Sequence, residues 1–170
     1  MGQRGWHNRG YLPHFDGYDV TQHVVFRLHD SVPPGETEGD DVLDRGLGSA
    51  LLAYPRNAEI VARALRFHDH ERYELAAWCV MPNHVHVLLT TKQKFELGAI
   101  VRTWKQFSAN SINKAVGRSG AVWAADYFDR YVRDQAQFDT AKRYIEMNPV
   151  VAGLCDKAED WRFSSVGWSD

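Results

Sequence analysis

The stretch Trp78–Leu89, WCVMPNHVHVLL, decides the fold of this chain of 170 residues. It contains the end of one apolar strand, predicted over Tyr73–Met81, and most of a second, predicted over His84–Thr90. The two strands are joined tightly at Pro82-Asn83, a pair of residues that favours a turn. Two apolar strands in a hairpin predict an antiparallel sheet, and the flanking segments indicate how that sheet is completed.

The flanking segments alternate between strand and helix patterns. Two further strands are predicted, over Thr21–His29 and Tyr127–Arg133. Helices are predicted over Asn57–His68, after Pro55, and over Phe95–Val116. A last helix is predicted to begin after the N-cap Asp134, which has Gln137 three residues on, and to end at Pro149. This order predicts an α+β fold of the ferredoxin-like type, with a four-stranded antiparallel sheet and two helices on one face. In this topology the third strand, which contains His84 and His86, is central, and the final helix is free to cover the other face.

The length predicts one domain over residues 1–170, which begins with an N-terminal arm at about Met1–Asp19 that lacks periodicity. The longest apolar run, Leu75–Met81, is too short to span a bilayer, and the first residues lack the apolar core of a signal peptide. Cys79 and Cys155 have no metal or redox spacing and are expected to be buried, reduced thiols. We therefore expect a cytoplasmic protein without membrane contact.

The net charge of −2 argues against a nucleic-acid partner, but the charges are unevenly distributed. Asp30–Asp44 contains six acids and no base, and an acidic loop is predicted there after Pro33-Pro34-Gly35. In contrast, Val101–Val150 contains eight bases and five acids. A local surplus of positive charge can form a basic groove for DNA, although a solvated charged face gives the same count. The candidate DNA-binding residues in this region are Arg102, Lys105, Arg130 and Arg133.

The histidine pair His84 and His86 is the first candidate site. Side chains alternate along a strand, so both imidazoles project from one face, about 7 Å apart along the strand, and can share one divalent metal ion. In the last helix Tyr144 and Asn148 lie four residues apart and therefore on one face. Each feature alone also fits a structural role: histidines on a strand edge, a half-buried tyrosine, or a polar residue before a proline.

Two imidazoles and one amide oxygen form a metal site with open positions. Such a set suits Mg²⁺ or Mn²⁺, and Zn²⁺ is an alternative. An open position can hold a phosphodiester oxygen, and a phenol one helical turn from a ligand can attack the phosphorus. The phenol has an ordinary pKa of about 10, and a nearby cation favours its ionised form.

These motifs resemble a known family. Trp78–Leu89 is similar to the histidine-hydrophobic-histidine signature of the single-tyrosine HUH transposases. Tyr127–Asp134 and Tyr144–Leu154 are similar to the branch called REP-associated tyrosine transposases, and the ends of the chain, RGYLPHF from Arg9 and WRFSS from Trp161, also fit it. The resemblance covers nearly the whole chain.

The resemblance implies that His84, His86 and Asn148 are metal ligands, with Asn148 where relatives often carry glutamine, and that Tyr144 is the nucleophile. It implies an enzyme that cleaves single-stranded DNA at palindromic repeat hairpins, through a 5′-phosphotyrosine and a free 3′-hydroxyl. It also implies that the N-terminal arm reads a guide sequence at the foot of the hairpin. Arg4, Trp6, His7, Arg9 and Tyr11 are the candidates there, since arginine and aromatic side chains suit unpaired bases.

Several alternatives remain open from the sequence. Tyr127 and Tyr131 compete for the nucleophile role, but one of them is expected in the core and neither has a ligand-type residue one helical turn away. His23, His29, His68 and His70 are expected at the surface or satisfied in the core. The protein could instead be a hairpin-binding protein without catalysis, or a metal-dependent hydrolase that uses water. It is expected to be a monomer or a homodimer.

Overall fold

The computed structural model describes residues 6–8, 13–15 and 17–169, with side chains for 17–169. The strands are β1 (Trp6–Asn8), β2 (Pro13–Phe15), β3 (Thr21–Arg27), β4 (Tyr73–Val80), β5 (His84–Thr91) and β6 (Phe128–Tyr131). The α-helices are α1 (Asp40–Leu43), α2 (Pro55–Arg66), α3 (Leu97–Val116) and α4 (Gln135–Val151), with 3₁₀ turns η1 (Leu51–Ala53) and η2 (Ala158–Asp160).

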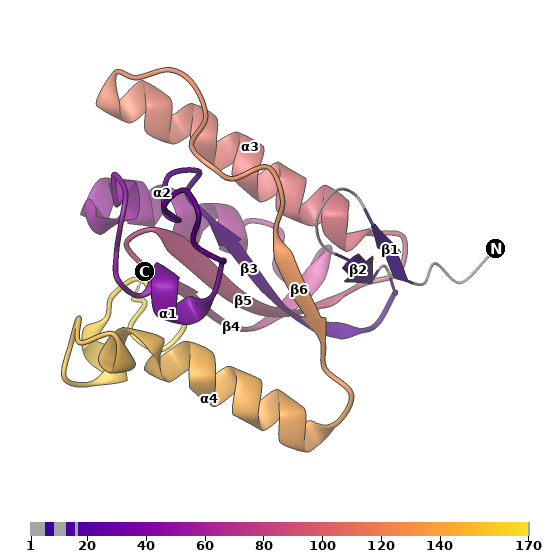
Figure 1. Cartoon of the computed structure of the whole chain (residues 1–170). Coiled ribbons are helices and arrows are strands. Elements are labelled where there is room, and N and C mark those ends of the chain that lie inside the picture. Colours follow the sequence, from indigo (N-terminus) through magenta and orange to yellow (C-terminus); the bar gives the residue numbers. More distant parts are fainter. Residues whose placement is uncertain (1–5, 9–12, 16, 170) are drawn as a thin grey trace.

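The main sheet has four strands in the order β4-β5-β3-β6, and every neighbouring pair is antiparallel (Figure 1). Along the chain these strands alternate with helices as β3-α2-β4-β5-α3-β6, which places the first and third strands at the centre. The predicted ferredoxin-like α+β fold is confirmed. Strand β5, which contains the two histidines, is central as predicted, and His86 pairs with Val25 of β3.

The two faces of the sheet are covered by different helices. Val85 and Val87 of β5 belong to the larger core, together with residues of α2 and α3. Leu88, on the other face, packs in a smaller core with Ile145 of α4. Figure 1 shows α2 and α3 on one side of the sheet and α4 on the other. Because side chains alternate along β5, His84 and His86 share the face of Leu88 and lie under α4.

Helix α4 begins as predicted and ends later than predicted. The Asp134 carboxylate accepts a hydrogen bond from the Gln137 backbone N–H at 2.8 Å, which caps the helix. Pro149 was expected to end the helix, but it lies inside α4, which continues to Val151. A proline so near the C-terminus removes only one backbone hydrogen bond, and the chain leaves the helix after Ala152 at Gly153, whose φ is +73°.

Several short elements have no counterpart in the sequence patterns. Within the N-terminal arm, β1 and β2 pair as a small antiparallel sheet, and β2 lies next to β6. The acidic segment expected to be a loop contains α1. Both cysteines are free thiols, but Cys155 is only partly buried, contrary to expectation. Among the described residues, no helix combines the length and apolarity needed to cross a membrane.

Candidate metal and nucleophile site

The two histidines of β5 meet under α4. Both side chains are fully buried, and their Nε2 atoms lie 3.1 Å apart. Two neighbouring ligands of an octahedral ion with bonds of about 2.1 Å stand about 3 Å apart, so this separation fits one cation between the two imidazoles.

The neighbouring asparagine determines which nitrogen of His84 is free. The side-chain N–H of Asn83 donates a hydrogen bond to the Leu47 carbonyl. This contact turns Asn83 Oδ1 toward His84 Nδ1, and the two atoms lie 2.8 Å apart. The Nδ1–H of His84 donates to that oxygen, and the lone pair of Nε2 is left toward His86. Contacts of this kind commonly orient histidine ligands of metals.

A third histidine joins the site from β3. His23 Nε2 lies 3.0 Å from His86 Nδ1 and forms a hydrogen bond with it. His23, which was expected at the surface or satisfied in the core, is partly buried and hydrogen-bonded to one of the predicted metal ligands. Alternation along β3 already places His23 on one face with Val25, but only the pairing of Val25 with His86 brings the two imidazoles together.

Burial keeps all three imidazoles neutral. Desolvation lowers the pKa of His84 to about 3 and that of His23 to about 4, and it holds the pKa of His86 well below its usual value. A neutral imidazole keeps the lone pair that binds a metal ion, so these side chains could coordinate a cation at neutral pH.

Helix α4 brings Tyr144 and Asn148 to the same place. The Tyr144 ring lies 5.6 Å from the His86 ring, and the side chain is 39% exposed. Asn148 is 2% exposed and hydrogen-bonds the Tyr144 hydroxyl, while its Oδ1 has no hydrogen-bond partner within residues 17–169. A buried oxygen without a partner costs free energy, which a ligand bound beside it would offset. Of the competing tyrosines, Tyr127 is buried in the core.

Helix α1 adds two carboxylates that the sequence did not single out. Tyr144 donates its hydroxyl hydrogen bond to Asp40 Oδ2, and Asp44 Oδ1 lies 3.6 Å from His84 Nε2. Burial, and then the charge of Asp40, raise the pKa of Tyr144. Burial and two neighbouring aspartates raise the pKa of Asp44 to about 6. The spacing of Asp40 and Asp44 is one helical turn, which was the only signal in the sequence.

A cavity of about 1030 Å³ opens beside Tyr144. Its wall includes Tyr144, His23, Phe128, Arg130 and Arg133, so two of the predicted DNA-binding residues line it. Arg130 pairs with His23 across β3 and β6, which explains why both project from the face under α4.

The other predicted DNA-binding residues lie elsewhere. Arg102 and Lys105 are on α3, on the opposite side of the sheet, and the Lys105 ammonium donates to the carbonyls of Ala124 and Ala125 at 2.6 and 3.2 Å. Arg4, Arg9 and Tyr11 lie outside the described residues. Trp6 and His7 belong to β1, where only the backbone is described.

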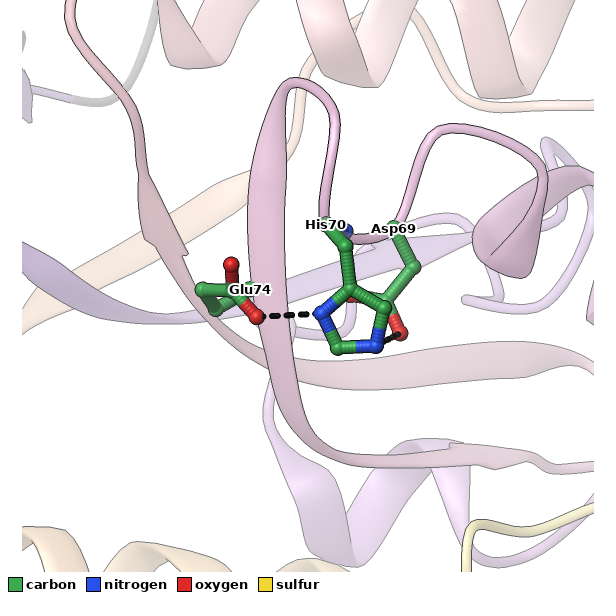
Figure 2. Close-up of side chains that lie close together, drawn as sticks. All are labelled: Asp69, His70 and Glu74. Atoms are coloured by element: carbon green, nitrogen blue, oxygen red, sulfur yellow. Dashed lines mark hydrogen bonds and ion pairs between the residues drawn. The ribbon is translucent and has the colours of Figure 1, made fainter.

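A second group of possible metal ligands lies at the start of the edge strand β4. Figure 2 shows His70 between Asp69 and Glu74, with His70 Nδ1 2.6 Å from Glu74 Oε2. His70 is exposed, and both carboxylates already have partners: Asp69 accepts from the backbone N–H groups of His70 and Leu75, and Glu74 forms an ion pair with Lys92. We interpret this group as a hydrogen-bonded turn that starts β4.

The chain is similar in sequence to known proteins. The family model described as "Transposase IS200 like" matches residues 55–148, more than half of the chain. A protein of Haemophilus influenzae assigned as a REP-associated tyrosine transposase is 24% identical over 107 residues, which are 57% of this chain and 61% of that protein. The chain therefore aligns with less than two thirds of the length of this relative.

Among solved structures, a REP-associated tyrosine transposase bound to a REP hairpin superposes with a TM-score of 0.68 at 19% identity, covering 93% of this chain and 83% of that one. This similarity concerns the fold. A Deinococcus radiodurans structure superposes with a TM-score of 0.43 at 20% identity, covering 84% of this chain and 96% of that one. The matched family segment includes His84, His86, Tyr144 and Asn148. The chain belongs to the IS200-like transposase family.

Proposed function

We propose that this protein is a metal-dependent endonuclease and strand transferase that acts on single-stranded DNA at palindromic hairpins. Tyr144 is the nucleophile, and Mg²⁺ or Mn²⁺ is held by His84, His86 and Asn148. The observation that carries this proposal is the meeting of an exposed phenol with two neutral imidazoles and an unpartnered amide oxygen. The hairpin-bound relative of the same fold supports the choice of substrate.

The tyrosine performs the covalent step. The Tyr144 oxygen forms a bond with the phosphorus while the bond from phosphorus to the 3′-oxygen breaks, which yields a 5′-phosphotyrosine and a 3′-hydroxyl. A later 3′-hydroxyl reverses the step and joins a new strand. The cation, when bound, neutralises charge on the phosphate oxygens.

The cavity beside Tyr144 would hold the DNA on either side of the scissile bond. Arg130 and Arg133 offer positive charge to phosphates, and the half-exposed ring of Phe128 offers a face on which a base can stack. The arm residues Arg4, Trp6, His7, Arg9 and Tyr11 remain our candidates for reading the hairpin foot. Arg102 and Lys105 would contact only DNA that reaches around to α3.

One chain contains the whole constellation. Tyr144 contacts the histidines of its own chain, so no residue of a second copy is needed to complete the site. This supports a monomer as the functional unit, with a homodimer as the alternative. Because the proposed substrate is DNA, we also propose that the protein acts in the cytoplasm.

The first test is a cleavage assay on labelled single-stranded hairpin DNA with Mg²⁺ or Mn²⁺. We expect wild type to form a protein-linked product on a denaturing gel, and we expect Tyr144→Phe to form none while it still binds the hairpin. Tyr54→Phe, which alters an exposed tyrosine away from the site, is the matched control and should behave as wild type.

Two other results would identify the alternatives. Cleavage that persists in Tyr144→Phe without an adduct would establish a hydrolase that uses water. Hairpin binding without cleavage, with either cation, would establish a binding protein.

A further inference from the structure

We propose that Asp40 is the base that takes the phenol proton of Tyr144 when the tyrosine attacks DNA. The inference rests on the proposed function, because it concerns the same nucleophile. Asp40 touches the reacting atom itself: the Tyr144 hydroxyl donates its hydrogen bond to Asp40 Oδ2. A general base must be within hydrogen-bond reach of the proton that it removes, and Asp40 meets this condition.

Neighbouring contacts hold Asp40 in place. Val42 and Leu43 of α1 are buried and attach the helix to the rest of the protein. Asp40 is the first residue of α1, so the residues that follow it in the chain restrict its position. On the N-terminal side, Glu38 forms an ion pair with Arg27 of β3 at 2.9 Å. Figure 1 shows α1 beside α4, the helix of Tyr144.

Tyr144 needs a base because an ordinary phenol, with a pKa of about 10, is protonated at neutral pH and is a poor nucleophile in that form. Transfer of the proton within the pair keeps its total charge at −1 and moves that charge from the carboxylate to the attacking oxygen. The repulsion that opposes ionisation of Tyr144 therefore disappears as the proton moves.

Other ionisable groups face this pair and are less suited to the role. His23 lies on β3 with its ring 6.0 Å from the Tyr144 ring, and its Nε2 is engaged with His86. Asp44 is directed to His84, and Arg130 of β6 is a cation that cannot accept a proton. Among the described residues, the one carboxylate hydrogen-bonded to the Tyr144 oxygen is Asp40.

The step is balanced as follows. The Tyr144 oxygen bonds to phosphorus, its proton passes to Asp40, and the 3′-oxygen leaves with the electron pair of its broken bond and takes a proton from water. In strand transfer, an incoming 3′-hydroxyl loses its proton to water as it attacks phosphorus, and the released Tyr144 oxygen recovers the proton from Asp40. Asp40 therefore ends the cycle ionised.

The experiment measures the single-turnover rate of adduct formation on hairpin DNA. The test variant is Asp40→Asn, whose amide oxygen still accepts a hydrogen bond but cannot hold the proton. General-base catalysis contributes about 10²–10⁴-fold, so we expect a decrease of about 100-fold or more. Asp41→Asn removes the same charge from the neighbouring exposed position and should stay within about twofold of wild type.

Chemical rescue separates proton transfer from positioning. In Asp40→Ala, added formate should restore adduct formation in proportion to its concentration, whereas Tyr144→Phe should not respond. Circular dichroism and hairpin binding should be unchanged in both Asp40 variants. Loss of the negative charge alone would make Tyr144 easier to ionise, so a slower Asp40→Asn cannot be caused by the lost charge, and the response to formate then separates proton transfer from positioning.

The outcomes distinguish this inference from the proposed function. If wild type forms the adduct and Asp40→Asn forms it equally fast, Asp40 is not the base and the nuclease proposal stands. If Asp40→Asn and Asp40→Ala are slow and formate has no effect, Asp40 only positions Tyr144, and the inference is overturned. If wild type forms no adduct with any cation, both proposals fail.

Discussion

Asn148 combines a stability cost with a proposed metal-binding role in a single amide group. Its N–H donates a hydrogen bond to the Tyr144 hydroxyl, and its oxygen is buried without a partner in residues 17–169. A buried acceptor without a hydrogen bond costs about 1–3 kcal/mol, which the protein tolerates at a site where a ligand supplies the missing contact. The Nε2 atoms of His84 and His86, in contrast, face each other at a distance that fits one cation.

This residue yields a prediction about metal binding. We expect Mn²⁺ to raise the melting temperature of wild type, with a stabilisation of about 2.7 kcal/mol at one hundred times the dissociation constant. In Asn148→Leu we expect no loss of stability without Mn²⁺ and a much smaller rise with it, because the unpartnered oxygen is gone. Thermal denaturation with and without Mn²⁺ measures both effects. Met147→Leu, one position away and partly exposed, is the control; an equal Mn²⁺ response in Asn148→Leu would remove Asn148 from the ligand set.

Two helices of very different length position the nucleophile. Helix α4 has its own start signal, and its buried Ile145 attaches it to the sheet. Helix α1 has four residues, too few to be stable alone, and it depends on the burial of Val42 and Leu43. For this reason α4 could be predicted from its cap and periodicity, whereas α1 was expected to be a loop.

The cap of α4 can be tested by substitution. We expect Asp134→Ala to lower the free energy of unfolding by about 1 kcal/mol, because the Gln137 N–H loses its acceptor. Asp134→Ser should recover most of this loss, since serine also caps helices well. Urea denaturation gives the values, and equal stability of Asp134→Ala and wild type would show that solvent replaces the cap.

The sheet separates the charged groups of the whole molecule. The face under α4 contains Tyr144, the histidines and the cavity with Arg130 and Arg133, while Arg102 and Lys105 lie with α3 on the other side. The net charge of −2 conceals this arrangement, because acidic residues near α1 offset the arginines across the cavity. In the proposed function, local charge rather than net charge would determine where DNA binds.

Salt dependence can identify the face that binds DNA. We expect Arg130→Gln and Arg133→Gln each to weaken hairpin binding and to reduce the slope of log affinity against log salt concentration by about 0.7–0.9. Arg102→Gln should change both quantities less. Fluorescence anisotropy with labelled hairpin at several salt concentrations measures them, and a larger effect of Arg102→Gln would place the main DNA contacts on α3.

Local patterns in the sequence were enough for the alternation of strands and helices, the central place of β5 and the pairing of Tyr144 with Asn148. These features depend on the periods of strand and helix, which can be read residue by residue. Three features required the tertiary structure: the contact of His23 with His86, the closeness of Asp40 to Tyr144, and the separation of Arg102 from Arg130. Each depends on strand register or on helix packing between segments far apart in the chain, and such contacts leave no period in the sequence.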